Sequence, residues 1–314
     1  MVGKGGCVVL LDNLSGADRG SEQGSTVLLQ TKDGRVQFVR QGEERFALVK
    51  VPVDFPVRYP LRRTTFSKPA KAVLMDLDGT TVLSEHYWID AIRETVARVL
   101  GDSSFRFSSA DLPYVSGYST REHLAYCQGK YDLPASLDEL KDVHKIVVEE
   151  RLAQLAESDG AALEPGPGLK EFLIALKQAG VRLGIVTSAA QRKAMLELDL
   201  VFRKLDLGPP EQFYDVIITA GTYGATGTAS TLGGLASKPH PWLYLEAARV
   251  GLGLGEEEWQ HVVCIEDSTA GVIAAHLAGF AVLGLNTGSL AQSGVESLLL
   301  GQGDSLLDFL PLLI

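Results

Sequence analysis

From residue 69 onward, short apolar runs alternate with longer stretches of helical periodicity. The apolar runs cover residues 72–77, 181–186, 215–219, 261–265 and 281–285. Runs of this length between polar turns are typical of buried strands. Because strands that alternate with helices favour a parallel sheet covered on both faces, we predict an α/β fold for this part of the chain.

The stretch from about 84 to 164 interrupts that alternation. Apolar residues recur three to five positions apart on one helical stripe, namely Leu137, Leu140, Val143, Val147, Leu152 and Leu155. Asp and Ser residues around 108–111 and 136–138 suit helix starts. We predict an inserted α-helical domain over residues 84–164, between the two parts of a core domain, 69–83 and 165–314.

The first 68 residues have a β-rich pattern instead. Apolar runs at 27–30 and 36–39 flank Asp33-Gly34, which is a hairpin signal, and residues 46–51 indicate a further strand. Prolines 52, 56 and 60, followed by Arg62-Arg63, indicate a linker. No catalytic constellation is evident in residues 1–68, so we predict a small accessory β module.

Charge and composition narrow the functional classes. The 314 residues carry a net charge of −10, which argues against a general nucleic-acid binder or a protein of anionic membranes. The three cysteines have no metal-ligand spacing, which favours free thiols in a reducing compartment. No apolar stretch approaches the ~18 residues of a membrane span. We expect a cytoplasmic protein, and read the Gly/Thr/Ser-rich residues 220–237 as a connection rather than a phosphate-binding loop.

The most informative motif is Asp76-Leu77-Asp78-Gly79-Thr80, which follows the first apolar run of the α/β region. Open α/β sheets bind ligands at the carboxyl ends of their strands. Two carboxylates one residue apart at such an end suit a nucleophile, a metal and a proton donor together. The alternative interpretation is a simple strand-ending turn.

Three further polar groups occur near apolar runs, in a fixed order. Thr187-Ser188 follows the second run, where it would form an anion site or a helix N-cap. Lys238 precedes Pro239 and a helical stretch, and a lone lysine there is usually a surface residue. Glu266-Asp267-Ser268 follows the fourth run, where it would hold a cation or form a solvated acidic turn.

Taken together, these four elements resemble the haloacid dehalogenase-like (HAD) hydrolase superfamily over roughly residues 69–314. The insertion resembles the helical cap of the C1 class. The run from Glu266 to Gly279 resembles the branch that contains β-phosphoglucomutase and the sugar-phosphate phosphatases. The resemblance implies a Rossmann-like core and Mg²⁺-dependent phosphoryl chemistry.

Residue roles follow from the same resemblance. Asp76 would be the nucleophile that forms an aspartyl-phosphate, and Asp78 the general acid and then the general base. Mg²⁺ would be held by the Asp76 carboxylate, the Asp78 backbone carbonyl and Asp267, with Glu266 nearby.

The remaining implied residues would bind the phosphoryl group or the substrate. Thr187 and Ser188 would donate hydrogen bonds to phosphoryl oxygens, and Lys238 would balance the negative charge. Arg121 is the nearest match to a substrate-binding arginine on the cap. His123 is expected to pack or lie on the surface.

The predicted function is a Mg²⁺-dependent phosphatase of a small phosphorylated metabolite, a sugar or polyol phosphate. The alternatives are a phosphosugar mutase of the β-phosphoglucomutase type and a non-catalytic binding protein whose N-terminal module carries the function. The intact set of motif residues weighs against the binding protein. We expect no nucleic-acid or membrane partner, and a monomer or weak homodimer.

Overall fold

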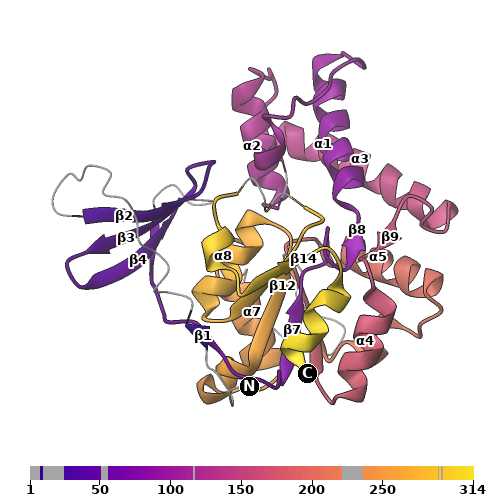
Figure 1. Cartoon of the computed structure of the whole chain (residues 1–314). Coiled ribbons are helices and arrows are strands. Elements are labelled where there is room, and N and C mark those ends of the chain that lie inside the picture. Colours follow the sequence, from indigo (N-terminus) through magenta and orange to yellow (C-terminus); the bar gives the residue numbers. More distant parts are fainter. Residues whose placement is uncertain are drawn as a thin grey trace.

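The computed structural model describes residues 8–9, 25–50, 56–115, 117–220, 236–288, 290 and 293–314. Its centre is a six-stranded sheet in the order β11-β10-β7-β12-β13-β14, in which all neighbours are parallel. Figure 1 shows this sheet in the lower half of the molecule. The strands are β7 (Ala72–Met75), β10 (Arg182–Thr187), β11 (Val216–Thr219), β12 (Val262–Glu266), β13 (Ala281–Leu285) and β14 (Gly301–Gly303). The predicted α/β class is therefore confirmed.

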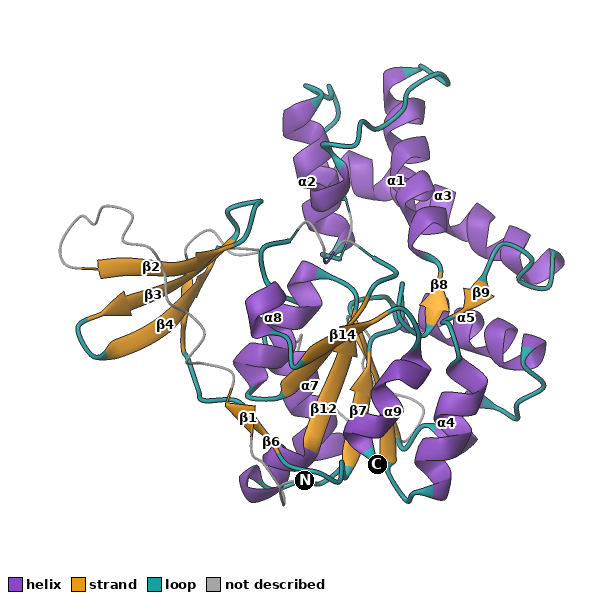
Figure 2. Ribbon diagram, viewed as in Figure 1, coloured by secondary structure: helices purple, strands orange, loops and turns teal. Residues whose placement is uncertain are grey.

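Helices cover the two faces of this sheet (Figure 2). Alternate side chains of β7 point to opposite faces, as strand geometry requires. Val73 and Met75 pack with α4 (Leu169–Gln178) and α5 (Gln191–Lys204), whereas Ala72 and Leu74 pack with the apolar residues of α7 (Trp242–Glu246) and α8 (Thr269–Ala278). Short helices α6 (Pro210–Phe213) and α9 (Leu310–Leu313) complete the core.

Some predicted strand boundaries differ from the observed ones. The first apolar run was expected to be strand through residue 77, but β7 ends at Met75. Leu77 is apolar because it is fully buried within the turn that follows, not because it belongs to the ladder. Apolarity reports burial, and burial extends beyond the residues that pair with neighbouring strands.

Three helices rise above the carboxyl edge of the sheet, at the top of Figure 1. They are α1 (Glu85–Leu100), α2 (Thr120–Lys130) and α3 (Leu137–Glu157), and we call them the cap helices. The chain enters and leaves them through a two-stranded antiparallel ribbon, β8 (Val82–Leu83) with β9 (Glu164–Pro165).

The helix starts of the cap agree only in part with the sequence prediction. Ser136 caps α3 in a capping box with Glu139, as expected for residues 136–138. The start expected near 108–111 yields only a 3-10 turn, Leu112–Tyr114. The α2 helix begins after Ser119, which forms its own capping box with Glu122.

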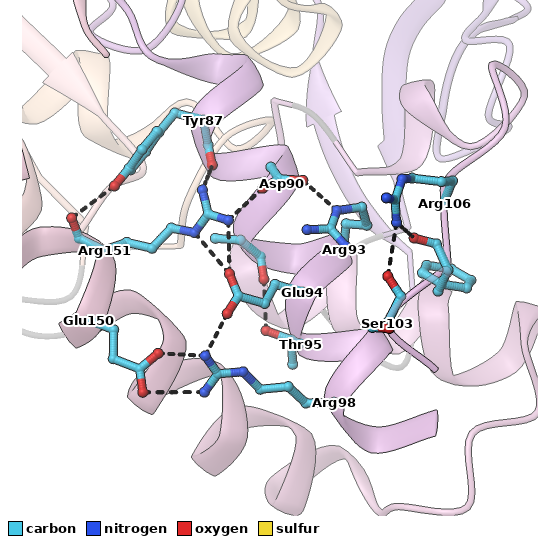
Figure 3. A network of polar contacts seen from close by, with 12 residues as sticks. Tyr87, Asp90, Arg93, Glu94, Thr95, Arg98, Ser103, Arg106, Glu150 and Arg151 are labelled. Atoms are coloured by element: carbon cyan, nitrogen blue, oxygen red, sulfur yellow. Dashed lines mark hydrogen bonds and ion pairs between the residues drawn. The ribbon is translucent and has the colours of Figure 1, made fainter. Parts of the chain in front are cut away.

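A polar network holds α1 against α3 (Figure 3). The Arg151 guanidinium of α3 donates to Asp90, at 2.5 Å, and to Glu94, at 2.8 Å, both on α1. Arg98 of α1 binds Glu94 and Glu150. Because the Arg151 side chain is largely buried, its two ion pairs are less screened than surface pairs and tie the two helices together.

The N-terminal residues form a separate antiparallel sheet in the order β2-β3-β4-β5, to the left in Figure 1. Its strands are β2 (Ser25–Gln30), β3 (Val36–Gln41), β4 (Glu44–Val49) and β5 (Val57–Pro60). The expected hairpin is confirmed. The predicted linker was wrong at Pro60, which lies in β5; since β5 is an edge strand, proline costs no interior ladder bond. A second pair joins β1 (Val8–Val9) to β6 (Thr65–Phe66).

The cysteines and the lengths of the helices bear on two further predictions from the sequence. Cys127 and Cys264 are buried free thiols, as expected for Cys264. Most of the predicted connection at 220–237 lies outside the described residues, as does Cys7. Within the described part of the chain, none of the helices combines the length and apolarity needed to cross a bilayer.

Candidate active site

The turn after β7 is fixed by its own hydrogen bonds. The Asp76 N–H donates to Ile265 of the neighbouring strand, and the Thr81 hydroxyl donates 2.6 Å back to the Asp76 carbonyl. Gly79 has φ +82°, and a Cβ atom there would lie 2.0 Å from Oδ2 of Asp267. The DxDGT turn can therefore press against the acidic end of β12 only because residue 79 is glycine.

A buried lysine links the two acidic strand ends. Lys238 is only 2% exposed, and its ammonium binds a carboxylate oxygen of Asp76 and, at 2.6 Å, Oε1 of Glu266. The Tyr244 hydroxyl donates to the same Glu266 oxygen at 2.5 Å. The interpretation of Lys238 as a surface residue is excluded by this burial.

Within this cluster, burial and the oppositely charged partner shift the pKa of each group in opposite directions. Burial, together with the neighbouring Glu266, raises the pKa of Asp76, while Lys238 opposes the shift. For Lys238 the two carboxylates outweigh burial and raise its pKa, so it stays an ammonium ion. The cluster has more carboxylates than lysines and calls for additional positive charge.

Asp267 offers the means to bind that charge. Its Oδ2 atom is buried and has no hydrogen-bond partner among the described residues. Single carboxylate oxygens of Asp76, Glu266 and Asp267 lie within 4.8 Å of one another, a grouping that could hold a metal ion. Glu266 has both oxygens engaged, by Lys238, Tyr244 and Ser268, so Asp267 presents the freer ligand. These oxygen donors fit Mg²⁺.

The hydroxyls of Thr187, the last residue of β10, and of Ser188 lie at the same edge. Thr187 is buried, and its Oγ1 accepts from the Ala189 N–H at 3.0 Å. The Ser188 hydroxyl accepts from the backbone N–H of Lys238 at 3.3 Å. The helix that follows begins only at Gln191, with Ala190 as its N-cap, so neither hydroxyl serves as the helix cap.

Asp78 belongs to a second charged cluster that the sequence reasoning missed. Its Oδ1 accepts from Lys193 of α5 at 2.5 Å and from the Ser84 hydroxyl at 2.6 Å. Lys193 also lies 3.3 Å from Glu197, which is fully buried and accepts from the indole N–H of Trp88. A lysine and a glutamate four residues apart, just after the Thr-Ser motif, were the only available signal.

A cavity of about 220 Å³ brings these groups together between the sheet edge and the cap helices. Core residues Asp76, Asp78, Thr187, Ser188, Lys193 and Lys238 line one side. The cap contributes mainly apolar and aromatic side chains. They include Trp88, Ile89, Ile92, Val115, Tyr118 and Val148.

The structure does not bring Arg121 into this cavity. Arg121 is exposed on α2 and is absent from the residues that line the cavity. His123, expected to pack or lie on the surface, is buried and also lines the cavity, and its Nε2 accepts from the Tyr118 N–H at 3.3 Å. Two positions along a helix turn a side chain by about 200°, so a small register difference selects another face.

A parallel sheet with helices on both faces, a helical insertion after its first strand and carboxylates at its carboxyl edge defines a capped α/β enzyme class. The model of the haloacid dehalogenase-like hydrolase family matches residues 70–279. The chain belongs to this family. The superfamily resemblance, and with it an enzyme of the hydrolase class, is thereby confirmed.

Individual relatives cover most of the chain. It is 30% identical over 235 residues to a phosphorylated carbohydrates phosphatase of Thermotoga maritima, covering 73% of this chain and 93% of that protein. It is 31% identical to the validoxylamine A 7'-phosphate phosphatase of Streptomyces hygroscopicus subsp. limoneus, covering 72% and 91%. The crystal structure of CbbY from Rhodobacter sphaeroides in complex with phosphate shares the fold, with TM-score 0.59, 24% identity and coverage of 76% and 96%.

Proposed function

We propose that the protein is a Mg²⁺-dependent phosphatase that hydrolyses a small phosphorylated metabolite through a phosphoryl group carried on Asp76. The observation that carries this proposal is the buried Asp76 carboxylate, paired with Lys238 and facing a cavity shared with Asp78. Beside it, Oδ2 of Asp267 has no partner within the described part of the chain, which supports a divalent cation at this site.

The residues suit a two-step transfer. In the first step an Asp76 oxygen attacks phosphorus, the ester bond breaks, and Asp78 gives its proton to the leaving oxygen. In the second step Asp78 takes a proton from water as that water attacks the phosphorus, which releases phosphate and restores Asp76. Lys238 balances the charge, while Thr187 and Ser188 donate hydrogen bonds to phosphoryl oxygens.

Asp76, the Asp78 backbone carbonyl and Asp267 would hold Mg²⁺, with Glu266 positioned beside them through Lys238. When bound, the ion supplies positive charge that offsets the carboxylates and the phosphoryl oxygens. The cap helices, residues 84–164 in our proposed domain division, would exclude water from the cavity and select the leaving group.

A sugar or polyol phosphate is the proposed substrate class. Two curated relatives support it, since one is named for phosphorylated carbohydrates and the other for validoxylamine A 7'-phosphate. A cavity of about 220 Å³ also suits a small ester. A cytoplasmic location and a monomeric or weakly dimeric state remain predictions from the sequence.

One observation favours hydrolysis over the mutase alternative. A mutase that passes through a bisphosphate must hold a second phosphoryl group, which usually requires a lysine or arginine. Among the described residues that line the cavity, the lysines are Lys193 and Lys238, and both already pair with aspartates. The cap side contributes no lysine or arginine there.

The test is phosphate release from a panel of phosphorylated metabolites, with Mg²⁺ or with a chelator, for the wild type and Asp76→Asn. We expect release only from the wild type with Mg²⁺, and full activity of Asp76→Asn would refute the proposal. Matching thermal unfolding would show that the variant is folded. A hexose 1-phosphate assayed with a bisphosphate primer tests the mutase, because isomerised sugar phosphate would then accumulate instead of phosphate.

A further inference from the structure

The N-terminal sheet reaches the active site through one turn. We call residues 117–119, which lead into α2, the cap loop. The turn between β2 and β3, residues 31–35, contacts this loop. The Tyr118 hydroxyl donates to Oδ2 of Asp33 at 2.5 Å. The Arg35 guanidinium lies 4.3 Å from the centre of the Tyr118 ring, a cation–π distance.

This contact is buried and internally braced. The side chains of Asp33 and Arg35 are only 4% and 13% exposed. The other Asp33 oxygen accepts from the Thr31 hydroxyl at 2.5 Å and from the Arg35 N–H at 3.0 Å. Hydrogen bonds within the turn therefore hold the Asp33 carboxylate in place independently of Tyr118. A carboxylate held in this way can fix the position of the Tyr118 ring.

The sheet is anchored on the core within a few residues of this turn. Phe38 of β3 is fully buried and stacks on His276 of α8, with ring centres 5.8 Å apart. The Tyr59 hydroxyl lies 2.6 Å from Nδ1 of His240, two residues after the active-site Lys238. The turn thus projects from a sheet that cannot shift without disturbing the apolar core.

The cap loop itself lies between this turn and the catalytic edge. Gly117 and Tyr118 both line the cavity. Gly117 has φ +73°, and a Cβ atom there would come within 2.9 Å of Ser268, the residue after Asp267. Glu122, at the start of α2, also faces the turn: burial raises its pKa, and Arg35 opposes that shift.

We propose that residues 33–35 are a positioning element of the active site, which holds the cap loop over the cavity through Tyr118 and thereby sets the fit of the leaving group. The N-terminal sheet is then part of the substrate-recognition apparatus, although none of its described residues lines the cavity. This inference rests on the proposed phosphatase function for its kinetic test, but not for its structural one.

The test uses full-length point variants, because removing the sheet would expose the apolar face of α8. Asp33→Asn and Tyr118→Phe each weaken the same hydrogen bond, and Lys32→Gln changes an exposed residue of the same turn as the matched control. The readouts are KM and kcat for the best phosphate ester, and the inhibition constant of inorganic phosphate with Mg²⁺.

We expect Asp33→Asn and Tyr118→Phe each to raise KM about tenfold, with kcat and the inhibition constant of inorganic phosphate within about twofold of wild type. The double variant should be no worse than either single one, since both changes remove one bond. Lys32→Gln should behave as wild type. An unchanged KM in Asp33→Asn, or effects that multiply in the double variant, would overturn the proposal.

Amide hydrogen exchange provides the structural readout. Peptides covering the cap loop should exchange faster in Asp33→Asn and Tyr118→Phe than in the wild type or Lys32→Gln. Wild-type exchange rates in both variants would contradict the positioning role of residues 33–35, even if the protein released no phosphate. If the wild type were inactive but the cap loop exchanged faster in the two variants, the proposed phosphatase function would be refuted. The positioning role of residues 33–35 would still be supported.

Discussion

Two lysine–carboxylate clusters border the cavity, and they have the same composition but different surroundings. Lys238 joins Asp76 to Glu266, and all three belong to the core. Lys193 joins Asp78 to Glu197, but its cluster also includes Trp88 at the start of cap helix α1. The comparison indicates that the proposed nucleophile is fixed by the core alone, whereas the proposed proton donor is held at the boundary between core and cap.

Among the variants that test this comparison, Lys238→Met should have the largest effect. We expect phosphate release to fall about a thousandfold for every substrate, because the variant leaves Asp76 and Glu266 buried without their shared cation. Steady-state kinetics with saturating Mg²⁺ would measure the loss. Lys71→Met, which removes an exposed pair with Glu258, is the control and should keep its activity. A loss of activity below tenfold in Lys238→Met would contradict the proposed role of Lys238 as the shared cation of Asp76 and Glu266.

Lys193→Met should have a smaller effect that depends on the leaving group. If Lys193 positions Asp78 for proton donation, loss of Lys193 should slow alkyl phosphates about 10- to 100-fold. A nitrophenyl phosphate needs little protonation and should be slowed far less.

The same kinetic comparison should be made for Arg203→Met, an exposed position on the same helix. This control should leave both substrates unaffected. Equal losses of Lys193→Met on both substrates would indicate a structural role for Lys193 instead.

Glu197→Gln should have the smallest effect, on stability rather than turnover. Burial raises the Glu197 pKa from 4.5 to about 8, and one carboxylate oxygen has no hydrogen-bond partner among the described residues. The folded protein therefore binds a proton that the unfolded chain releases between these values. This contribution to the free energy of unfolding is full below pH 4.5 and is lost as the pH rises toward 8.

Glutamine keeps the acceptor for Trp88 and carries no charge, so the variant should lose less stability over that window. We expect Glu197→Gln to gain on the order of 1–3 kcal/mol relative to wild type between pH 5 and pH 8. Denaturant unfolding at the two pH values measures this difference. A parallel pH dependence in the two proteins would show that Glu197 is already ionised in the folded state.

The same comparison separates what the sequence can reveal from what it cannot. Asp76, Thr187 and Asp267 stand at the ends of apolar runs, and parallel strands end at one edge. Lys238 was assigned only through the family resemblance, because its position alone suggested a surface lysine. Lys193 and Glu197 lie within an amphipathic helix, where charged residues normally face solvent. Only the tertiary packing of α5 against the cap brings Lys193 to the cavity, with Glu197 buried beside it.

Long-range docking explains the remaining differences. Arg121 and His123 are two positions apart, and the helix register, not the residue type, decides which faces the cavity. Nothing local in residues 1–68 specifies their contact with the cap. A partial signal existed in α8, which is apolar around its whole circumference and must therefore be covered on every side, here partly by Phe38.

The β8–β9 ribbon has a consequence for how the chain folds. Val82 pairs with Pro165 and Leu83 with Glu164, so the long excursion through the cap begins and ends at adjacent backbone positions. Closing a loop of this length costs entropy once, and the ribbon secures that closure beside β7 and β10. The central sheet can then assemble as though the excursion were a single tight turn, whatever sequence the excursion contains.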